Sequence, residues 1–195
     1  MLKTFVLSGL FAVIFSSFAF AGDLNAAFDS LKNLGTNFEP DGAVCEELEK
    51  VRLGQIYPAD KFLISGDIEY STGKETIGEL DTVVIDRSTG KVVLLGEVKC
   101  WKNMEDGLMK AKSQMLRFFW NLEKHPNSLR FTSYGDTNIT AAQVPLNTPF
   151  YTVGPQGSVA QGATFELNLT LKETQHLRMM LLKCQQNGEC PSPQY

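Results

Sequence analysis

The stretch IGELDTVVIDRSTGKVVLLGEVKCW, residues 77–101, decides our expectation of the fold. It contains two apolar runs, Val83–Ile85 and Val92–Leu95, separated by the polar residues RSTGK. Runs of this length around a glycine-containing loop predict an antiparallel β-hairpin. Both alternating sets of side chains in the second run are apolar, which is typical of a central strand buried on both faces.

Three charged residues lie at the open end of this hairpin. Alternation places Glu97 and Lys99 on one face of the second strand, with Asp81 at the start of the first. If Asp81 lies opposite Glu97, then Ile85 lies opposite Val93 and a five-residue loop closes the hairpin. A slip of one residue would send Asp81 to the other face. The favoured register gathers two carboxylates and one ammonium group.

Adjacent buried carboxylates are costly unless positive charge is nearby. Lys99 supplies one such charge, and a hard divalent cation with oxygen ligands, Mg²⁺ above all, would supply more. The alternative is a structural ion-pair cluster or a solvated strand end, since charge clusters are not always functional. The partner Asp81 and the apolar run favour a cation site.

The segment 78–81 (GELD), the hairpin and the segment 97–99 (EVK) resemble the core of the PD-(D/E)XK nuclease superfamily. The resemblance is to the Holliday-junction-resolvase-like and nuclease-related-domain branches, and it covers residues 44–122. Leu80-Asp81 stands where many members have Pro-Asp. The resemblance implies an α/β, restriction-endonuclease-like fold, with a central mixed β-sheet flanked by helices. It also implies a Mg²⁺-dependent endonuclease.

The resemblance further implies which residues form the metal site. Asp81, Glu97 and the carbonyl of Val98 would bind Mg²⁺, for which Mn²⁺ could substitute. A glutamate on the preceding helix would complete the site. Glu47 is the candidate because it shares a helical face with the apolar residues at 44, 48 and 51, and Glu46 is the reserve. The alternative for Glu46 and Glu49 is a solvated helix surface.

The catalytic lysine would be Lys99, which would orient the attacking water or stabilise the transition state. Gln114, on the helix after the second strand, matches a glutamine that recurs near the site in several branches. Lys110 and Arg117 lie on the same helical flank as Gln114, and Lys102 precedes them. We expect these three basic residues to bind substrate.

The segment from Lys99 to Lys124 is locally basic, with six Lys or Arg residues against three acids. Local charge is what contacts phosphate, although a solvated helix flank is the alternative. The helix expected there begins after Asn103 as its N-cap. We expect its neighbouring aromatic residues to be core rather than base-stacking platforms, namely Trp101, Phe118, Phe119 and Trp120.

The first 21 residues predict a secretory signal, with Lys3, an apolar run and an Ala19-Phe20-Ala21 cleavage site. A membrane anchor is the alternative, but the run is short for a span. Cleavage of 21 residues from 195 leaves 174, residues 22–195, which suit one nuclease-like domain. With 17 basic and 22 acidic residues, that chain has a net charge of −5, which is unusual for a nucleic-acid enzyme.

All four cysteines lie in the mature chain, namely Cys45, Cys100, Cys184 and Cys190. An even number in an exported protein indicates two disulfides, for which three connectivities exist. The short separation of Cys184 and Cys190 favours that pair, which would leave Cys45 to bond Cys100. Zinc is disfavoured because Cys-x-x-Cys is absent and the chain has two histidines. We expect a bacterial protein in the periplasm or the medium.

The remaining chain predicts alternating helices and strands. The expected helices cover residues 22–35, 44–53 and 103–122, with a last one after a Thr170–Glu173 capping box. The expected strands outside the hairpin cover residues 61–70, 129–134, 149–153 and 164–169. This order indicates one α/β domain.

The function we expect is an exported nuclease that hydrolyses DNA more readily than RNA, with a homodimer suggested by the family. A first alternative is a catalytically inactive module that binds nucleic acid or protein in the cell envelope. A second is a structural envelope protein whose acids merely pair with Lys99. A Ser-His-Asp hydrolase is the weakest, with two histidines and no Gly-x-Ser-x-Gly.

Overall fold

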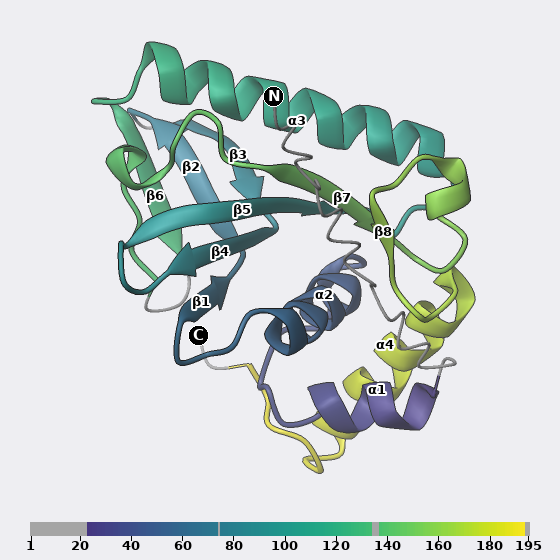
Figure 1. Cartoon of the computed structure of the whole chain (residues 1–195). Coiled ribbons are helices and arrows are strands. Elements are labelled where there is room, and N and C mark those ends of the chain that lie inside the picture. The colour runs from purple at the N-terminus through teal and green to yellow at the C-terminus, as the bar shows by residue number, and fades with distance from the viewer. Residues whose placement is uncertain (1–22, 74, 134–136, 194–195) are drawn as a thin grey trace, which may run out of the picture.

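The structure, a computed structural model, describes residues 23–73, 75–133 and 137–193 (Figure 1). This part of the chain is a mixed α/β protein. Its helices are α1 (Leu24–Leu31), α2 (Ala43–Ile56), α3 (Met104–Lys124) and α4 (Leu171–Gln186), with 3₁₀ turns η1 (Ala141–Gln143) and η2 (Val159–Gln161). Its strands are β1 (Phe62–Ser65), β2 (Ile68–Thr72), β3 (Glu75–Leu80), β4 (Thr82–Asp86), β5 (Lys91–Val98), β6 (Leu129–Ser133), β7 (Phe150–Gly154) and β8 (Phe165–Glu166). The expected signal sequence lies outside the described residues.

The larger sheet has five strands in the order β1-β4-β5-β7-β8. The β1–β4 and β4–β5 pairs are antiparallel, whereas the β5–β7 and β7–β8 pairs are parallel. The central mixed sheet expected from the sequence is therefore confirmed. A smaller antiparallel sheet in the order β3-β2-β6 stands beside it, which the sequence patterns do not indicate.

The hairpin of β4 and β5 has the predicted register at its open end. Thr82 pairs with Gly96, so Asp81 and Glu97 follow directly beyond the last pair, across from each other. Val83 and Leu95, two residues further in, are fully buried in the core. The apolar hairpin therefore delivers both carboxylates to the same end of the sheet.

Near its loop, the hairpin differs from the prediction. Ile85 pairs with Val92, one residue from the expected partner, and the register shifts just before Ile85. The cause is local turn chemistry: one carboxylate oxygen of Asp86 accepts hydrogen bonds from the backbone N–H groups of Ser88 and Thr89. This turn shortens the loop by one residue. The register shift before Ile85 compensates for it, so that the pairs nearer Asp81 have the predicted register.

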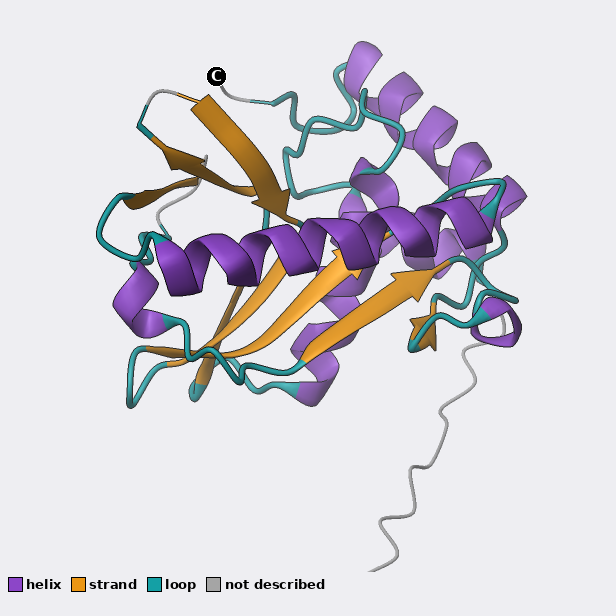
Figure 2. Ribbon diagram, turned by 90° about the horizontal axis from the view of Figure 1, so that it is seen from above, coloured by secondary structure: helices purple, strands orange, loops and turns teal. Residues whose placement is uncertain are grey.

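Helix α3 and the smaller sheet cover one face of the larger sheet, and α2 lies on the other (Figures 1 and 2). On the first face, Met115 and Phe118 of α3 pack with Tyr70 of β2 and Leu95 of β5. On the second face, residues of α2 pack with β4, β5 and β7. The end of the hairpin therefore lies between elements from both layers.

Helix α2 buries two faces. Its face of Val44, Leu48 and Val51 packs against α1 and α4, while Cys45 and Leu53 pack against the sheet. The helix also continues through Gly54 to Ile56, beyond the end expected from the sequence. The apolar periodicity therefore identifies the face that packs against helices, and not the face of Cys45 and Leu53 that packs against the sheet.

The single strand expected over residues 61–70 divides into β1 and β2, which belong to different sheets. The break falls at Gly66 and Asp67, where Asp67 has a φ of +52°. A side chain at Gly66 would collide with the backbone carbonyl of Asp81. The glycine therefore allows this crossing to pass directly against the start of β4.

Smaller differences concern element ends. α1 is shorter than expected, and β8 has two residues instead of six. Asn103 precedes α3 as predicted, but its side chain donates to the Asp106 carboxylate and does not cap the backbone. The Thr170–Glu173 capping box is confirmed at the start of α4.

Both expected disulfides are present, Cys45–Cys100 and Cys184–Cys190. The first ties the first turn of α2 to the residue pair that follows β5. The second closes the end of α4. Among the described residues, no helix is long and apolar enough to cross a membrane.

Candidate functional site

The three charged residues at the end of the hairpin are in direct contact. The Lys99 ammonium donates to Asp81 Oδ2 at 3.0 Å and to Glu97 Oε2 at 2.7 Å. Asp81 Oδ2 also accepts the backbone N–H of Val98 at 2.7 Å. The register of the hairpin therefore brings together the carboxylates that the sequence singles out, with Lys99 between them.

This contact is buried, with side-chain exposures of 9 % for Asp81, 1 % for Glu97 and 8 % for Lys99. Burial and the charge of Asp81 raise the pKa of Glu97, and Lys99 only partly opposes them. Burial alone would lower the pKa of Lys99, but the two carboxylates reverse this and raise it. One ammonium group thus serves two buried carboxyl groups, which favours the protonated form of Glu97 when no further cation is bound.

Helix α2 contributes Glu46 to the same negative field. Burial, followed by the charges of Asp81, Asp67 and Glu79, raises the pKa of Glu46 to about 8. Glu47, the residue expected there, is held differently: its carboxylate accepts from the Lys50 ammonium at 2.9 Å and from the Thr36 hydroxyl at 3.3 Å. The structure therefore places Glu46 in the field of Asp81, while Glu47 is separated from the centre by Lys50, whose ammonium also binds Asp67.

Two more acids border the site. Asp67, at the crossing between the sheets, pairs with Lys50 at 2.8 Å. Burial, then the charges of Asp67 and Asp81, raise the pKa of Glu79. We call the set Asp81, Glu97, Glu46, Glu79 and Asp67 the acidic centre. Its five carboxyl groups outnumber the ammonium groups of Lys99 and Lys50, so a further cation would stabilise their ionised forms.

Tyr70 connects helix α3 with the acidic centre. Its buried hydroxyl lies 3.5 Å from the backbone carbonyl of Gln114. Burial raises the pKa of Tyr70, Glu97 adds to this effect, and Arg117 opposes it, so the phenol lies near both charges. The side-chain Oε1 of Gln114 is buried without a hydrogen-bond partner in the described chain. Such an atom requires a donor, for which a bound water or substrate group is suited.

Of the other predicted substrate residues, Lys102 precedes α3 and Lys110 lies in its first half. The ammonium of Lys110 lies 4.9 Å from the ring centre of Trp101. Lys102 is exposed in the loop before the helix. The basic side chains are thus spread along the flank of α3, from the loop after Lys99 to Arg117.

A second buried network is not indicated by the sequence. Glu49 is fully buried. Its carboxylate accepts two hydrogen bonds of 2.7 Å from Arg52 and one of 2.6 Å from the Tyr151 hydroxyl. Tyr151 also contacts the hydroxyl of Thr82 at 2.9 Å. A side chain at Gly96 would collide with both Tyr151 and Thr82. This network joins α2 to the residue after Asp81, so it fixes the two elements that form the acidic centre.

The expectation that Glu46 and Glu49 are solvated is therefore wrong for Glu49. A sequence signal exists in hindsight: Cys45, Glu49 and Leu53 share a helical face, and both neighbours pack against the sheet. A glutamate between two core positions requires a buried partner.

The donor set suits one hard cation with open positions. Among the described residues, no three or more His, Cys, Asp and Glu side chains gather closely enough to hold a metal ion. Mg²⁺, however, is commonly held by one or two carboxylates, with water and substrate phosphate as its other ligands. Asp81 and Glu97 meet that requirement, because both already contact one cationic group.

Two hollows in the surface lie elsewhere. One of about 180 Å³ lies between α1, α2 and residues 167–169, and one of about 540 Å³ lies beside β6 and η1. Neither is lined by a residue of the acidic centre. A scan of family models, a search of curated proteins and a search of solved structures each found no match to the chain.

Proposed function

We propose that this protein is an exported, Mg²⁺-dependent nuclease that hydrolyses phosphodiester bonds in DNA. The observation that carries the proposal is the contact of Asp81, Glu97 and Lys99 at the end of a buried hairpin. Two carboxylates and a lysine at the end of paired strands are the arrangement that the PD-(D/E)XK resemblance leads one to expect. The mixed five-stranded sheet between helices supports a restriction-endonuclease-like fold as part of the same proposal.

In this proposal, Asp81 and Glu97 hold Mg²⁺, with the carbonyl of Val98 as a further ligand. The ion would lower the pKa of its bound water and neutralise charge on the phosphate. The ammonium of Lys99 is then released from part of its double contact and donates to a phosphate oxygen on which negative charge develops. Glu46 takes the role first expected for Glu47. Its raised pKa suits a group that accepts a proton from water near neutral pH.

Helix α3 would hold the nucleic acid beside this centre. Gln114 has the unpartnered side-chain oxygen, which can accept a hydrogen bond from water or from an amino group of a base. Lys110, Arg117 and Lys102 offer positive charge along the same flank, where a phosphate backbone can lie. A net-acidic protein can bind DNA through such a local basic surface, although its affinity should fall steeply with salt.

The two disulfides are compatible with an exported protein, in the periplasm or outside the cell. A homodimer belongs to the proposal through the family resemblance alone.

The experiment is a cleavage assay on plasmid and linear DNA, and on RNA, with Mg²⁺, Mn²⁺ or EDTA. Lys99→Met is compared with Lys91→Met, an exposed lysine at the other end of the same strand. We expect cleavage with either metal, none with EDTA, loss in Lys99→Met and full activity in Lys91→Met. If folded wild type cleaves neither nucleic acid, the inactive binding module replaces the nuclease. Retained affinity of wild type and Lys99→Met for DNA would then identify it.

A further inference from the structure

The protein has two tryptophans, Trp101 and Trp120, and both are partly exposed, at 39 % and 55 %. This corrects the expectation that they are core residues; of that aromatic group, Phe118 is fully buried and Phe119 is half-buried. A large aromatic ring kept in water is unfavourable, so its position and surroundings are informative. Only Trp101 lies beside the acidic centre, two residues after Lys99.

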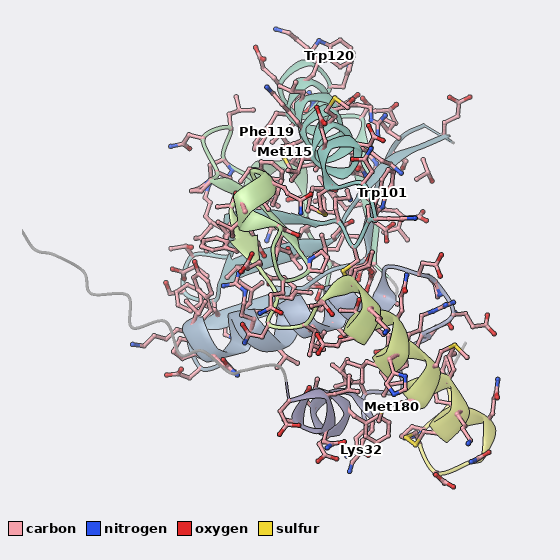
Figure 3. All side chains as sticks on the ribbon, turned by 90° about the vertical axis from the view of Figure 1, so that its right-hand side faces the viewer. Lys32, Trp101, Met115, Phe119, Trp120 and Met180 are labelled. Atoms are coloured by element: carbon pink, nitrogen blue, oxygen red, sulfur yellow. A yellow bond between two sulfur atoms is a disulfide. The ribbon has the colours of Figure 1, made fainter. Side chains whose placement is uncertain are left out.

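The side chains of Trp101 and Lys99 project to the same side of the backbone. A methyl group placed on Gly107, in the first turn of α3, would lie 3.4 Å from Cβ of Lys99 and 3.5 Å from Cβ of Trp101. Both side chains therefore begin against one glycine of that helix. Figure 3 shows Trp101 beneath the near end of α3, whereas Trp120 lies at the outer surface of the molecule.

The indole of Trp101 has Lys110 over its ring and keeps 39 % of its surface exposed. The Lys110 ammonium lies 4.9 Å from the ring centre, a cation–π distance, and its charge is available to an adjacent phosphate. In the described part of the chain, no aromatic ring packs against Trp101, whereas Trp120 contacts the ring of His125 at 5.1 Å. A flat exposed ring backed by a cation is suited to stacking a nucleobase.

We infer that Trp101 is a base-stacking platform next to the site of cleavage, so the preferred substrate has an unpaired nucleotide beside the scissile phosphate. A base inside a duplex is already stacked on both sides and cannot cover the indole without being extruded. A single strand or an overhang offers its bases freely. With the base on Trp101 and its phosphate at Lys110, the next phosphate along the chain can reach Lys99. This inference rests on the proposed nuclease function.

The experiment compares cleavage of a single-stranded oligonucleotide with that of the same sequence in a blunt duplex. Wild type should cleave the single strand at least tenfold faster. Trp101→Ala should lose about tenfold in kcat/KM on the single strand, the usual effect of removing one stacking ring, while Trp101→Phe keeps most activity. Trp120→Ala is the matched control and should behave like wild type. Faster cleavage of the duplex, or equal losses in the two alanine variants, would overturn the inference.

A binding measurement separates failure of this inference from failure of the proposed function. In Trp120→Phe, the fluorescence of Trp101 is the only tryptophan signal. We titrate it in EDTA with oligo(dT) and with a blunt duplex. Quenching by oligo(dT) alone supports the platform even if the protein never cleaves DNA, in which case only the nuclease proposal fails. Cleavage of DNA without quenching by oligo(dT) rejects the platform and leaves the nuclease proposal intact.

Discussion

Cys45 and Cys100 are joined by a disulfide, and each immediately neighbours a residue of the candidate site, Glu46 on one side and Lys99 on the other. The bond therefore connects the first turn of α2 covalently to the end of β5. No such neighbours flank the second disulfide, Cys184–Cys190, at the end of α4. The two bonds thus form a natural pair for comparison.

Removal of the first disulfide should affect both stability and the site. The bonds close segments of 55 and 6 residues. Loop entropy therefore predicts that the free energy of unfolding falls by about 4 kcal/mol without the first bond and by about 2 kcal/mol without the second. We expect Cys45→Ala/Cys100→Ala to weaken Mn²⁺ binding and slow cleavage, because Glu46 is no longer held against the hairpin. Calorimetric titration and urea unfolding measure these two effects.

The control for that pair is Cys184→Ala/Cys190→Ala, which should lose stability but bind Mn²⁺ as wild type does. Equal metal affinity in both double variants would contradict a role of the first disulfide in the site.

Lys99 should contribute strongly to stability when metal is absent. Lys99→Met leaves Asp81 and Glu97 buried without their cation, and breaking such a buried pair typically costs about 3 kcal/mol. We expect Mg²⁺ to recover part of this loss, since it can take the place of the ammonium. The melting temperature with and without Mg²⁺ measures this recovery, with Lys91→Met as an exposed control.

A larger Mg²⁺-induced shift in wild type than in Lys99→Met would count against competition between the lysine and the ion.

Glu46 and Glu47 make a direct comparison between neighbouring acids. Glu46→Gln removes the group proposed to accept a proton from water, so we expect cleavage to fall at least tenfold. Glu47→Gln weakens contacts with Lys50 and Thr36, so it should mainly lower stability, by about 1 kcal/mol. Steady-state cleavage beside urea unfolding separates these outcomes. The reverse order of activity would return the role to Glu47, as the sequence first indicates.

The acidic centre should make the metal-free protein less stable as pH rises. The pKa of Glu46 is raised from 4.5 to about 8 in the folded state, so between these values the folded chain binds more protons than the unfolded chain. Stability contributed by the neutral carboxyl group is therefore present at pH 5 and is lost as the pH rises through 8. Thermal unfolding in EDTA from pH 5 to 8 should show this decrease. Glu46→Gln should reduce the slope but not abolish it, because the pKa of Glu97 is raised in the same direction; an unchanged slope would exclude Glu46 as a cause.

The sequence predicts the hairpin end well because period-two alternation and one buried face fix the positions of Asp81 and Glu97. It fails at the loop, where the side chain of Asp86 sets the turn. It also fails on α2, because apolar periodicity marks one face of a helix and this helix buries two. The face of Val44 packs against other helices, whereas Glu49 lies on the face towards the sheet and is bound by Tyr151, a residue 102 positions away.

The smaller sheet also could not be predicted from the sequence pattern, because its separation from the larger sheet depends on a tertiary contact. A continuous strand-like run changes sheets at Gly66, and only the three-dimensional crossing shows that a side chain there would collide with Asp81. The position of Trp101 is also set by tertiary structure, through Gly107 of α3. Composition cannot distinguish it from a core aromatic residue.

The most direct test of the nuclease proposal is the rate at which the oxidised protein, expressed as residues 22–195, nicks supercoiled plasmid in Mg²⁺, measured for wild type, Asp81→Asn and Asp86→Asn. The two aspartates lie at opposite ends of the β4 segment, one in the acidic centre and one in the exposed turn. We expect metal-dependent nicking by wild type and Asp86→Asn, and none by Asp81→Asn. Nicking that survives in Asp81→Asn, or its absence from folded wild type with both Mg²⁺ and Mn²⁺, would contradict the proposal.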